Sequence, residues 1–205
     1  MKRGLIVFAR EPLPGRVKTR LAAAIGDQAA ADLYETMLQD VLKGVRDLSD
    51  VDTVVYWDCE EGSLPLLAGK YRCRSRRQIP GDLGQRMREA FEEMFADGCG
   101  LCCIIGSDAP DLPLPYILDA YRLLSTQQAD VVFGPSMDGG YYLLGLRHVW
   151  PQFFTDIHWG SAAVLDQSLA AARASGLPVS LLPVWRDIDT PEDLQAFRER
   201  TEEAI

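Results

Sequence analysis

The sequence predicts an α/β protein with a mostly parallel β-sheet, and three observations favour this fold class. Short apolar runs alternate with segments of helical period along the whole chain. The runs Gly4–Ala9 and Leu101–Gly106 are continuously apolar, which is typical of strands buried on both faces of a parallel sheet. The 205 residues contain no internal repeat, linker or low-complexity segment. We therefore expect a single domain over residues 1–205.

The first half of the chain alternates strands and helices in order. After the strand Gly4–Ala9, apolar residues recur every three to four positions from about Gly26 to Leu48, which predicts an amphipathic helix. The β-branched and aromatic run Thr53–Trp57 predicts a strand. A short helix is expected at Pro65–Lys70, and Asp82–Ala96 returns to the helical period. The basic cluster Arg72–Arg77 is interpreted as a solvent-exposed turn.

The second half continues the alternation after the buried strand Leu101–Gly106. A helix is expected at Pro115–Thr126, where prolines at its start suit the first helical turn. Thr190 predicts the N-cap of a last helix, because Pro191 and Glu192 follow it. The remaining expected elements are the strands Asp130–Pro135, Gly139–Leu146 and Pro178–Trp185 and the helix Ser161–Ser175.

Composition and charge exclude several classes of protein. The formal net charge is -9, and no basic stripe extends beyond the first loop, which argues against a nucleic-acid surface. No run of 18 or more apolar residues occurs, so no membrane span is expected. The apolar run before Arg10 is too short for a signal peptide, which favours a cytoplasmic protein.

The loop after the first strand holds an unusual density of cations for an acidic chain. Arg10, Arg16, Lys18 and Arg20 surround Gly15, whose freedom lets a backbone approach a ligand closely. Such a cluster binds phosphates well, and helix N–H groups at the loop's end would add to it. The alternative is a basic surface loop. Neither the P-loop spacing nor G-x-G-x-x-G is present.

Carboxylates follow two of the predicted strands. Ser107, Asp108 and Asp111 come directly after Leu101–Gly106, and Asp187 and Asp189 come after the last strand. Because the carboxyl ends of parallel strands meet at one edge of a sheet, both loops should supply ligands to one site. Carboxylate oxygens suit Mg²⁺ or Mn²⁺ beside substrate phosphates. The alternative is helix capping, which is favoured for Asp111 and also open for Asp189.

A third strand-end loop carries Asp138 with Gly139 and Gly140. Asp138 is a candidate for binding an acceptor hydroxyl, because the glycines permit close approach. A hairpin turn explains the same Asp-Gly pair equally well. Trp159, in an irregular segment before a helix, either lines a pocket or belongs to the core.

These stretches together resemble one family. The segments FAREPLPGRVKTRL, GDLGQRM, IGSDAPDLP, GPSMDGGYYLLGL, IHWGS and DIDTPEDL are similar, in this order, to the nucleotide-diphospho-sugar transferase superfamily. Within it the chain resembles the bacterial family DUF2064, and more distantly the molybdenum-cofactor nucleotidyltransferases and phospholactate guanylyltransferases. The resemblance implies the GT-A fold, a three-layer α/β/α arrangement with a mostly parallel mixed sheet.

The resemblance also implies roles for matching positions. The loop residues Gly15, Arg16, Lys18 and Arg20 would grip nucleotide phosphates, together with Arg10 and Ser107. Asp82, Leu83 and Gly84 would lie near the base or ribose. Asp108 stands at the metal-binding aspartate, in the form Gly-Ser-Asp rather than Asp-x-Asp, with Asp187 or Asp189 as the later ligand. Asp138, Gly139, Gly140 and Trp159 would face the acceptor.

Two hypotheses about function follow. The first is a Mg²⁺- or Mn²⁺-dependent transferase with a nucleotide donor and a small-molecule acceptor, in which Asp108, Lys18 and Asp138 are the catalytic candidates. Its chemistry is either nucleotidyl transfer from an NTP or glycosyl transfer from an NDP-sugar. The second is a nucleotide-binding or assembly module without turnover.

Overall fold

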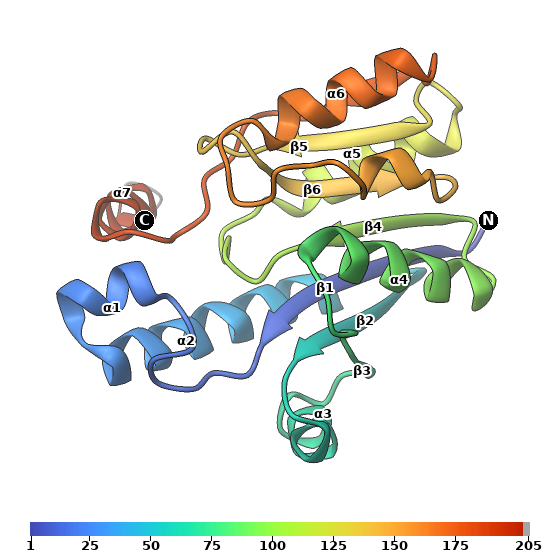
Figure 1. The fold of residues 1–205 in the computed structure, drawn as a ribbon. Helices are drawn as coiled ribbons and strands as arrows, with labels where there is room; N and C mark the ends of the chain where they lie inside the picture. The colour runs from blue at the N-terminus through green and yellow to red at the C-terminus, as the bar shows by residue number, and fades with distance from the viewer. Residues whose placement is uncertain (203–205) are drawn as a thin grey trace.

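The computed structural model describes residues 1–202, and within this range seven strands form one sheet between two layers of helices (Figure 1). The strands lie in the order β3-β2-β1-β4-β6-β5-β7. Among the described strands only β6 runs antiparallel to its neighbours β4 and β5. The mostly parallel mixed sheet is confirmed. The strands are β1 (Arg3–Arg10), β2 (Val51–Asp58), β3 (Ser75–Arg77), β4 (Leu101–Ile105), β5 (Val131–Pro135), β6 (Tyr141–Leu146) and β7 (Val179–Leu181).

The helices divide between the two faces of the sheet, which confirms the three-layer α/β/α arrangement. One face is covered by α2 (Asp27–Arg46), α3 (Leu64–Tyr71) and α5 (Leu114–Ser125). The other is covered by α4 (Leu83–Ala96) and α6 (Val164–Ala174). The helices α1 (Thr19–Ile25) and α7 (Pro191–Glu202) lie together beside the sheet (Figure 1). Short 3-10 helices occur at Glu61–Ser63 and Pro151–Phe153.

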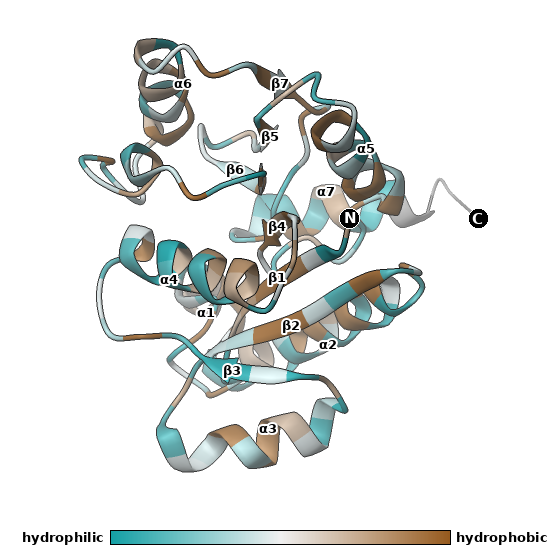
Figure 2. Cartoon of the chain, turned by 90° about the vertical axis from the view of Figure 1, so that its right-hand side faces the viewer, coloured by the Kyte–Doolittle hydropathy of each residue, from teal (hydrophilic) through white to brown (hydrophobic). Residues whose placement is uncertain are grey.

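The apolar strand runs form the core because both of their faces are covered. On β1, Leu5 and Val7 pack with α2 and α5, and Ile6 packs with α4. All three side chains are fully buried, and β1 and β4 are mostly brown in Figure 2. A continuous apolar run is therefore required at the centre of the sheet, as the sequence predicted.

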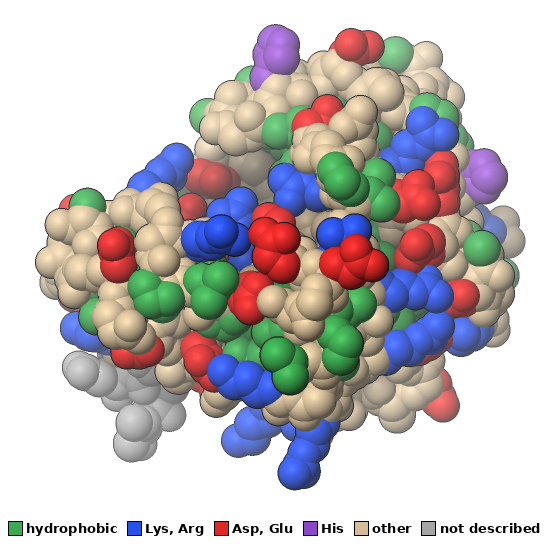
Figure 3. Space-filling view, turned by 60° about the horizontal axis from the view of Figure 1, so that its bottom comes forward, with side chains coloured by type: hydrophobic (Ala, Val, Ile, Leu, Met, Phe, Trp, Pro, Cys, Tyr) green, Lys and Arg blue, Asp and Glu red, His purple; other side chains and the backbone are tan. Residues whose placement is uncertain are grey.

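The prediction of a turn at Arg72–Arg77 is wrong. Residues Ser75–Arg77 form the edge strand β3, which pairs in parallel with β2. Arg74 forms ion pairs with Asp52 and Asp97, and Arg76 pairs with Asp97 and Glu93. These carboxylates come from β2, from α4 and from the residue that follows α4. They offset the positive charge of Arg74 and Arg76, which the sequence had indicated as solvent-exposed. Figure 3 shows cationic and anionic side chains side by side on the lower face of the molecule.

Three element boundaries also differ from the sequence prediction. The end of the loop that follows β1 forms a separate helix, α1. It is separate from α2 because the chain turns at Gly26, with φ 89°, before α2 begins. The expected helix from Ser161 begins only at Val164. The strand expected at Pro178–Trp185 ends at Leu181, since Pro183 has no N–H for the ladder. The chain rejoins the sheet at Trp185, whose N–H donates to the carbonyl of Pro135 at 3.0 Å.

The last helix begins as the sequence predicts. The Thr190 hydroxyl accepts from the N–H of Asp193 at 3.2 Å, and the Asp193 carboxylate accepts from the N–H of Thr190 at 3.0 Å. This reciprocal pair satisfies two backbone donors at the start of α7. Within residues 1–202 no helix is long and apolar enough to cross a membrane.

Candidate functional site

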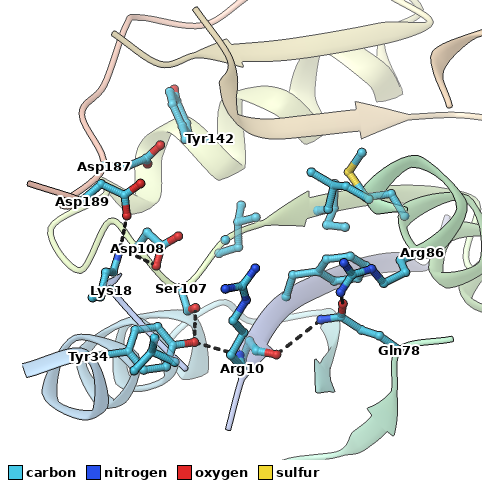
Figure 4. Close-up of a pocket in the computed structure, with 18 of the residues that line it drawn as sticks. Arg10, Lys18, Tyr34, Gln78, Arg86, Ser107, Asp108, Tyr142, Asp187 and Asp189 are labelled. Carbon is cyan, nitrogen blue, oxygen red and sulfur yellow. Dashed lines mark hydrogen bonds and ion pairs between the residues drawn. The ribbon is translucent and has the colours of Figure 1, made fainter. Parts of the chain in front are cut away.

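A cavity of about 410 Å³ lies where β1 and β4 end, at the carboxyl edge of the parallel strands. Ligands of open α/β sheets bind at this edge. Figure 4 shows its polar residues, which come from several loops and from α2 and α4. The polar and charged residues in its wall are Arg10, Lys18, Tyr34, Gln78, Arg86, Ser107, Asp108, Asp187 and Asp189, and the larger apolar and aromatic ones are Phe8, Leu83, Met87, Ile104, Ile105, Tyr141 and Tyr142.

The Lys18 ammonium forms the centre of the charged end of this cavity. Its Nζ lies 2.8 Å from Asp108 Oδ1 and 2.8 Å from Asp189 Oδ1, and the side chain is 3% exposed. Burial alone would lower the pKa of Lys18, but the charges of the two carboxylates outweigh it and raise that pKa above its ordinary value. The sequence prediction that these loops meet is correct, although Lys18 is the group that joins them.

Local backbone geometry aims Lys18 inward. Its φ of 48° and ψ of 44° are left-handed, and it occupies the N-cap position of α1. A non-glycine residue in this conformation is costly and persists only where the surroundings hold it. The two ion pairs supply that restraint here.

Backbone and hydroxyl contacts fix the loops around this cluster. The N–H of Ile188 donates to the carbonyl of Asp108 at 2.9 Å, which joins the segment after β7 to the loop after β4. The Tyr34 hydroxyl accepts from the N–H of Arg10 at 2.8 Å and lies 2.8 Å from Ser107 Oγ. Burial and the nearby Asp108 raise the pKa of Tyr34 to about 12, so its hydroxyl stays neutral. Tyr34 thus ties the loops after β1 and β4 to α2.

Asp187 is a third carboxylate at this end of the cavity. Burial, together with repulsion from Asp108 and Asp138, raises the pKa of Asp187 to about 7. Near neutral pH this carboxyl is therefore protonated in part of the molecules and charged in the rest. A cation entering the cavity would favour its charged form.

The other cations of the first loop are arranged differently. Arg10 lines the cavity, with its Nε 3.8 Å from Asp58. Arg16 is exposed and lies 3.9 Å from Glu60, outside this cavity. Arg20 is exposed on α1 and is not part of the wall. Gly15 adopts φ 75°, the left-handed turn that favours glycine. The proposed phosphate contacts of Gly15, Arg16 and Arg20 stay predictions.

The segment expected near the base or ribose contributes one side chain to the wall. Leu83 lines the cavity, whereas Asp82 caps α4 by accepting from the N–H of Gln85 at 2.8 Å. A Cβ at Gly84 would collide with the carbonyl of Phe154 and the indole of Trp159. Gly84 is thus required for close packing of α4, and Trp159 packs against it outside the cavity wall.

The turn between β5 and β6 is built as a hairpin. Asp138 Oδ1 accepts from the Ser136 hydroxyl and, at 3.0 Å, from the N–H of Gly140. Gly139 has φ 88° and packs against the backbone of Ala162. The turn interpretation explains these residues, and their contact with an acceptor stays a prediction.

Asp111 has a structural role other than the predicted cap. The α5 N-cap position is occupied by Pro113, without a side-chain cap. The Asp111 carboxylate instead accepts two hydrogen bonds from Arg200, at 2.9 and 3.1 Å, and one from Trp185 Nε1 at 3.3 Å. It therefore joins α7 to the sheet, a contact between segments 89 residues apart.

Tyr34, Gln78 and Arg86 line the cavity although the sequence did not single them out as site residues. Tyr34 fits the apolar face of α2, so its hydroxyl contacts gave no sequence signal. The sequence does contain a signal for Arg86, because this residue lies three positions after Leu83 on the apolar side of an amphipathic helix. A charged residue at such a position needs a partner or a ligand. Gln78 follows β3 and had no comparable signal.

The donor set fits a hard cation only in combination with a substrate. Within the described chain no group of three or more His, Cys, Asp or Glu side chains could hold a metal by itself. Mg²⁺ usually keeps one or two carboxylates and completes its shell with phosphate oxygens and water. Asp108 with Asp187 or Asp189 matches that pattern, and none of these residues offers a soft ligand.

Known proteins share this fold and part of this sequence. The family model described as "Uncharacterized protein conserved in bacteria (DUF2064)" matches residues 41–161. No curated protein sequence matches the chain significantly. The crystal structure of a "putative nucleotide-diphospho-sugar transferase" from Desulfovibrio desulfuricans G20 is 35% identical, with a TM-score of 0.90. That match covers 96% of this chain and 86% of the other.

More distant structures share the fold alone. CMP:2-keto-3-deoxy-manno-octonic acid synthetase complexed with CTP is 10% identical, with a TM-score of 0.66 and full coverage of both chains. Molybdopterin-guanine dinucleotide biosynthesis protein A from Archaeoglobus fulgidus is 15% identical, with a TM-score of 0.61, and the match covers 98% of this chain and 99% of that one. The fold is that of nucleotidyltransferases and nucleotide-diphospho-sugar transferases, as the sequence resemblance implied.

Lys18→Met should destabilise the protein without any ligand present. The substitution removes two charge-assisted hydrogen bonds and leaves Asp108 and Asp189 to repel each other, so we expect a loss of about 1.5–3 kcal/mol. Urea denaturation at pH 7 measures it. Arg20→Ala, at an exposed position of α1 two residues further along the chain, is the matched control and should change stability by about 0.5 kcal/mol or less. Equal effects of the two substitutions would contradict the central place of Lys18.

Asp187→Asn should stabilise the protein at alkaline pH only. The pKa of Asp187 is about 7 in the folded protein and about 3.9 in an unfolded chain. Between these values the folded state binds more protons, so the stability of the native protein falls as pH rises from about 4 to about 7. Asparagine buries no charge. At pH 8 we expect the variant to melt at least about 2–4 °C higher than the native protein, which is the shift that 1 kcal/mol produces in a domain of this size. Near pH 4 we expect the two proteins to have the same melting temperature.

Thermal melts with a chelator present measure this difference, because bound cations would mask the charge. Asp119→Asn, at an exposed carboxylate on α5, is the control. A gain that is the same at both pH values would argue against burial of a charged Asp187.

Proposed function

This chain belongs to the DUF2064 family of bacterial proteins, and we propose that it is a transferase that takes its reacting group from a nucleotide donor. The observation that carries the proposal is the Lys18 ammonium between Asp108 and Asp189, at the carboxyl edge of the sheet. Carboxylates and cations gathered at one end of a cavity suit a polyphosphate and its counter-ion. The similarity to a protein described as a "putative nucleotide-diphospho-sugar transferase" supports the same class.

The cations of the cavity would contact the donor's phosphates. Arg10 reaches the wall beside Ser107, and its guanidinium can donate two parallel hydrogen bonds to phosphate oxygens. Lys18 would shift one of its hydrogen bonds from a carboxylate to a phosphate oxygen without losing its charge balance. Negative charge that develops on the departing group would be stabilised by these donors, which are already in place.

A Mg²⁺ or Mn²⁺ ion would be held by Asp108 with Asp187 or Asp189. When bound, it would neutralise phosphate charge and act as a Lewis acid at the phosphoryl oxygens. The raised pKa of Asp187 means that this residue would lose its proton as the cation arrives. The residues of the chain would orient the donor and exclude water from the reacting group.

Two reactions fit this arrangement. In nucleotidyl transfer an oxygen of the acceptor attacks the α-phosphate of an NTP, the α–β bridge breaks and pyrophosphate leaves. In glycosyl transfer an acceptor oxygen attacks the anomeric carbon of an NDP-sugar, and the nucleoside diphosphate leaves. The β5–β6 turn with Asp138, Gly139 and Gly140 would lie on the acceptor side, because Asp138 is close enough to Asp187 to raise its pKa. Trp159 would contribute there only indirectly, through its packing on Gly84.

A thermal-shift panel tests the proposal. NTPs, NDPs and NDP-sugars are each compared with and without Mg²⁺ or Mn²⁺. A donor at 100 times its Kd should stabilise the protein by about 2.7 kcal/mol, or about 5–10 °C for a domain of this size. We expect a metal-dependent shift with one nucleotide. A larger shift with an NTP than with any NDP-sugar indicates nucleotidyl transfer, and the reverse indicates glycosyl transfer.

Asp108→Asn should abolish the metal dependence of that shift while the melting temperature of the free protein stays within a few degrees. Asp119→Asn, an exposed carboxylate on α5, is the matched control and should retain it. Absence of a shift with every nucleotide would overturn the proposal. A shift that needs no metal, with no product from any donor, would indicate a non-catalytic nucleotide-binding module.

A further inference from the structure

We propose that Arg86 selects the nucleobase of the donor, favouring a base with two hydrogen-bond acceptors on one edge. Guanine presents O6 and N7 in this way, and cytosine presents O2 and N3. The inference rests on the proposed nucleotide donor and adds a specificity-determining residue to it. Arg86 belongs to α4 and lines the same cavity as Lys18.

The cavity has two ends of different chemistry. Lys18, Asp108 and Asp189 lie at one end, and Gln78 and Arg86 lie at the other (Figure 4). Leu83 and Met87 share α4 with Arg86 and line the cavity too. A donor whose phosphates meet the charged end would therefore place its flat, largely apolar base over the α4 end.

The Arg86 guanidinium is held in place before any ligand binds. Its Nη1 donates to Gln78 Oε1 at 3.2 Å and to Asp58 Oδ2 at 3.2 Å. Gln78 in turn donates from Nε2 to the carbonyls of Tyr56 at 2.8 Å and Ala9 at 3.3 Å. Both amide hydrogens of Gln78 are thus used by β1 and β2. Gln78 therefore holds the Arg86 guanidinium against β1 and β2. The nitrogen atoms of Arg86 other than Nη1 remain to contact a ligand.

One edge of the Arg86 guanidinium makes no hydrogen bond to the described residues. Across residues 1–202, both hydrogen bonds of Arg86 come from Nη1, and its Nε is buried with no partner. Buried donors without partners are rare in folded proteins, and each requires an explanation. Nε and Nη2 lie on the same edge of the planar group, the edge that binds two acceptors at once. A ligand with two adjacent acceptors would satisfy it.

The charge around Arg86 favours a neutral base over a phosphate. Asp58 lies 3.2 Å from Arg86 and 3.8 Å from Arg10, so its charge offsets mainly that of the Arg86 guanidinium. An additional anion at this end would face Asp58. Among the common bases, guanine and cytosine present two acceptors side by side. Adenine places an amino donor beside its acceptors, and uracil has an N–H between its two carbonyls.

The test is a set of dissociation constants for GTP, CTP, ATP and UTP with Mg²⁺, measured by calorimetry. We expect GTP or CTP to bind at least about 10-fold more tightly than ATP and UTP, within the range of a bidentate arginine contact. Arg86→Lys keeps the positive charge but lacks the two-donor edge of the guanidinium. The affinities for the four nucleotides should then differ by no more than about 3-fold. Arg88→Lys, on the exposed side of α4, is the matched control and should retain the preference.

Base analogues test the same contact in the native protein, whether or not the variant folds. If guanine is preferred, 7-deaza-GTP should bind about 10-fold more weakly than GTP. If cytosine is preferred, 3-deaza-CTP should do so relative to CTP. Unchanged affinity for the matching analogue, or a preference that survives in a folded Arg86→Lys, would overturn the role of Arg86.

Failure of this inference is distinguishable from failure of the proposed function. Metal-dependent binding of all four nucleotides with equal affinity would overturn base selection and leave the proposed donor class standing. Tightest binding of ATP or UTP would do the same. Binding of none of them, nor of any NDP-sugar, would overturn both.

Discussion

The salt bridges of Lys18 are the constraint on which the geometry of the site depends. Lys18 is the one charged residue in the described part of the chain with less than a tenth of its surface exposed, 9%, and it contacts carboxylates 90 and 171 residues away. A buried ammonium is unfavourable unless it is paired and hydrogen-bonded. The loops after β1 and β4 and the segment before α7 must therefore meet at one point. Tyr34 and the backbone bond from Ile188 to Asp108 hold the same three segments together.

The balance of charge at this point also bears on the opening loop. Asp108, Asp187 and Asp189 outnumber Lys18, so this end of the cavity is not simply a basic trap for anions. Arg16 and Arg20 lie outside the wall, and only Arg10 and Lys18 of the loop's four cations reach it. A polyphosphate accompanied by its own divalent cation is the kind of ligand that suits such mixed charges. The cation would meet the carboxylates, and the phosphates would meet Lys18 and Arg10.

Much of this organisation could be predicted from the sequence. The apolar runs at β1 and β4 and the helical period of α2 and α4 are strong local signals, and the rule that parallel strands end at one edge brought Asp108 to Asp189. What the sequence did not predict depends on partners far away in the chain. The edge strand β3 is stabilised by carboxylates of β2, of α4 and of Asp97 just beyond it, and Asp111 is bound by Arg200. The polar contacts of Tyr34 and Gln78 are likewise long-range, so no local pattern indicates them.

The antiparallel strand β6 has a consequence for how this architecture can diversify. Parallel neighbours need a helical crossover, whereas β5 and β6 are joined by the short turn at residues 136–140. Chain added at such a turn leaves the flanking helices and the parallel half of the sheet in place. The cavity is lined by residues of β1, β4 and α4, among others, and by none from the turn at residues 136–140. Residues added at this hairpin would therefore leave the cavity residues of β1, β4 and α4 where they are.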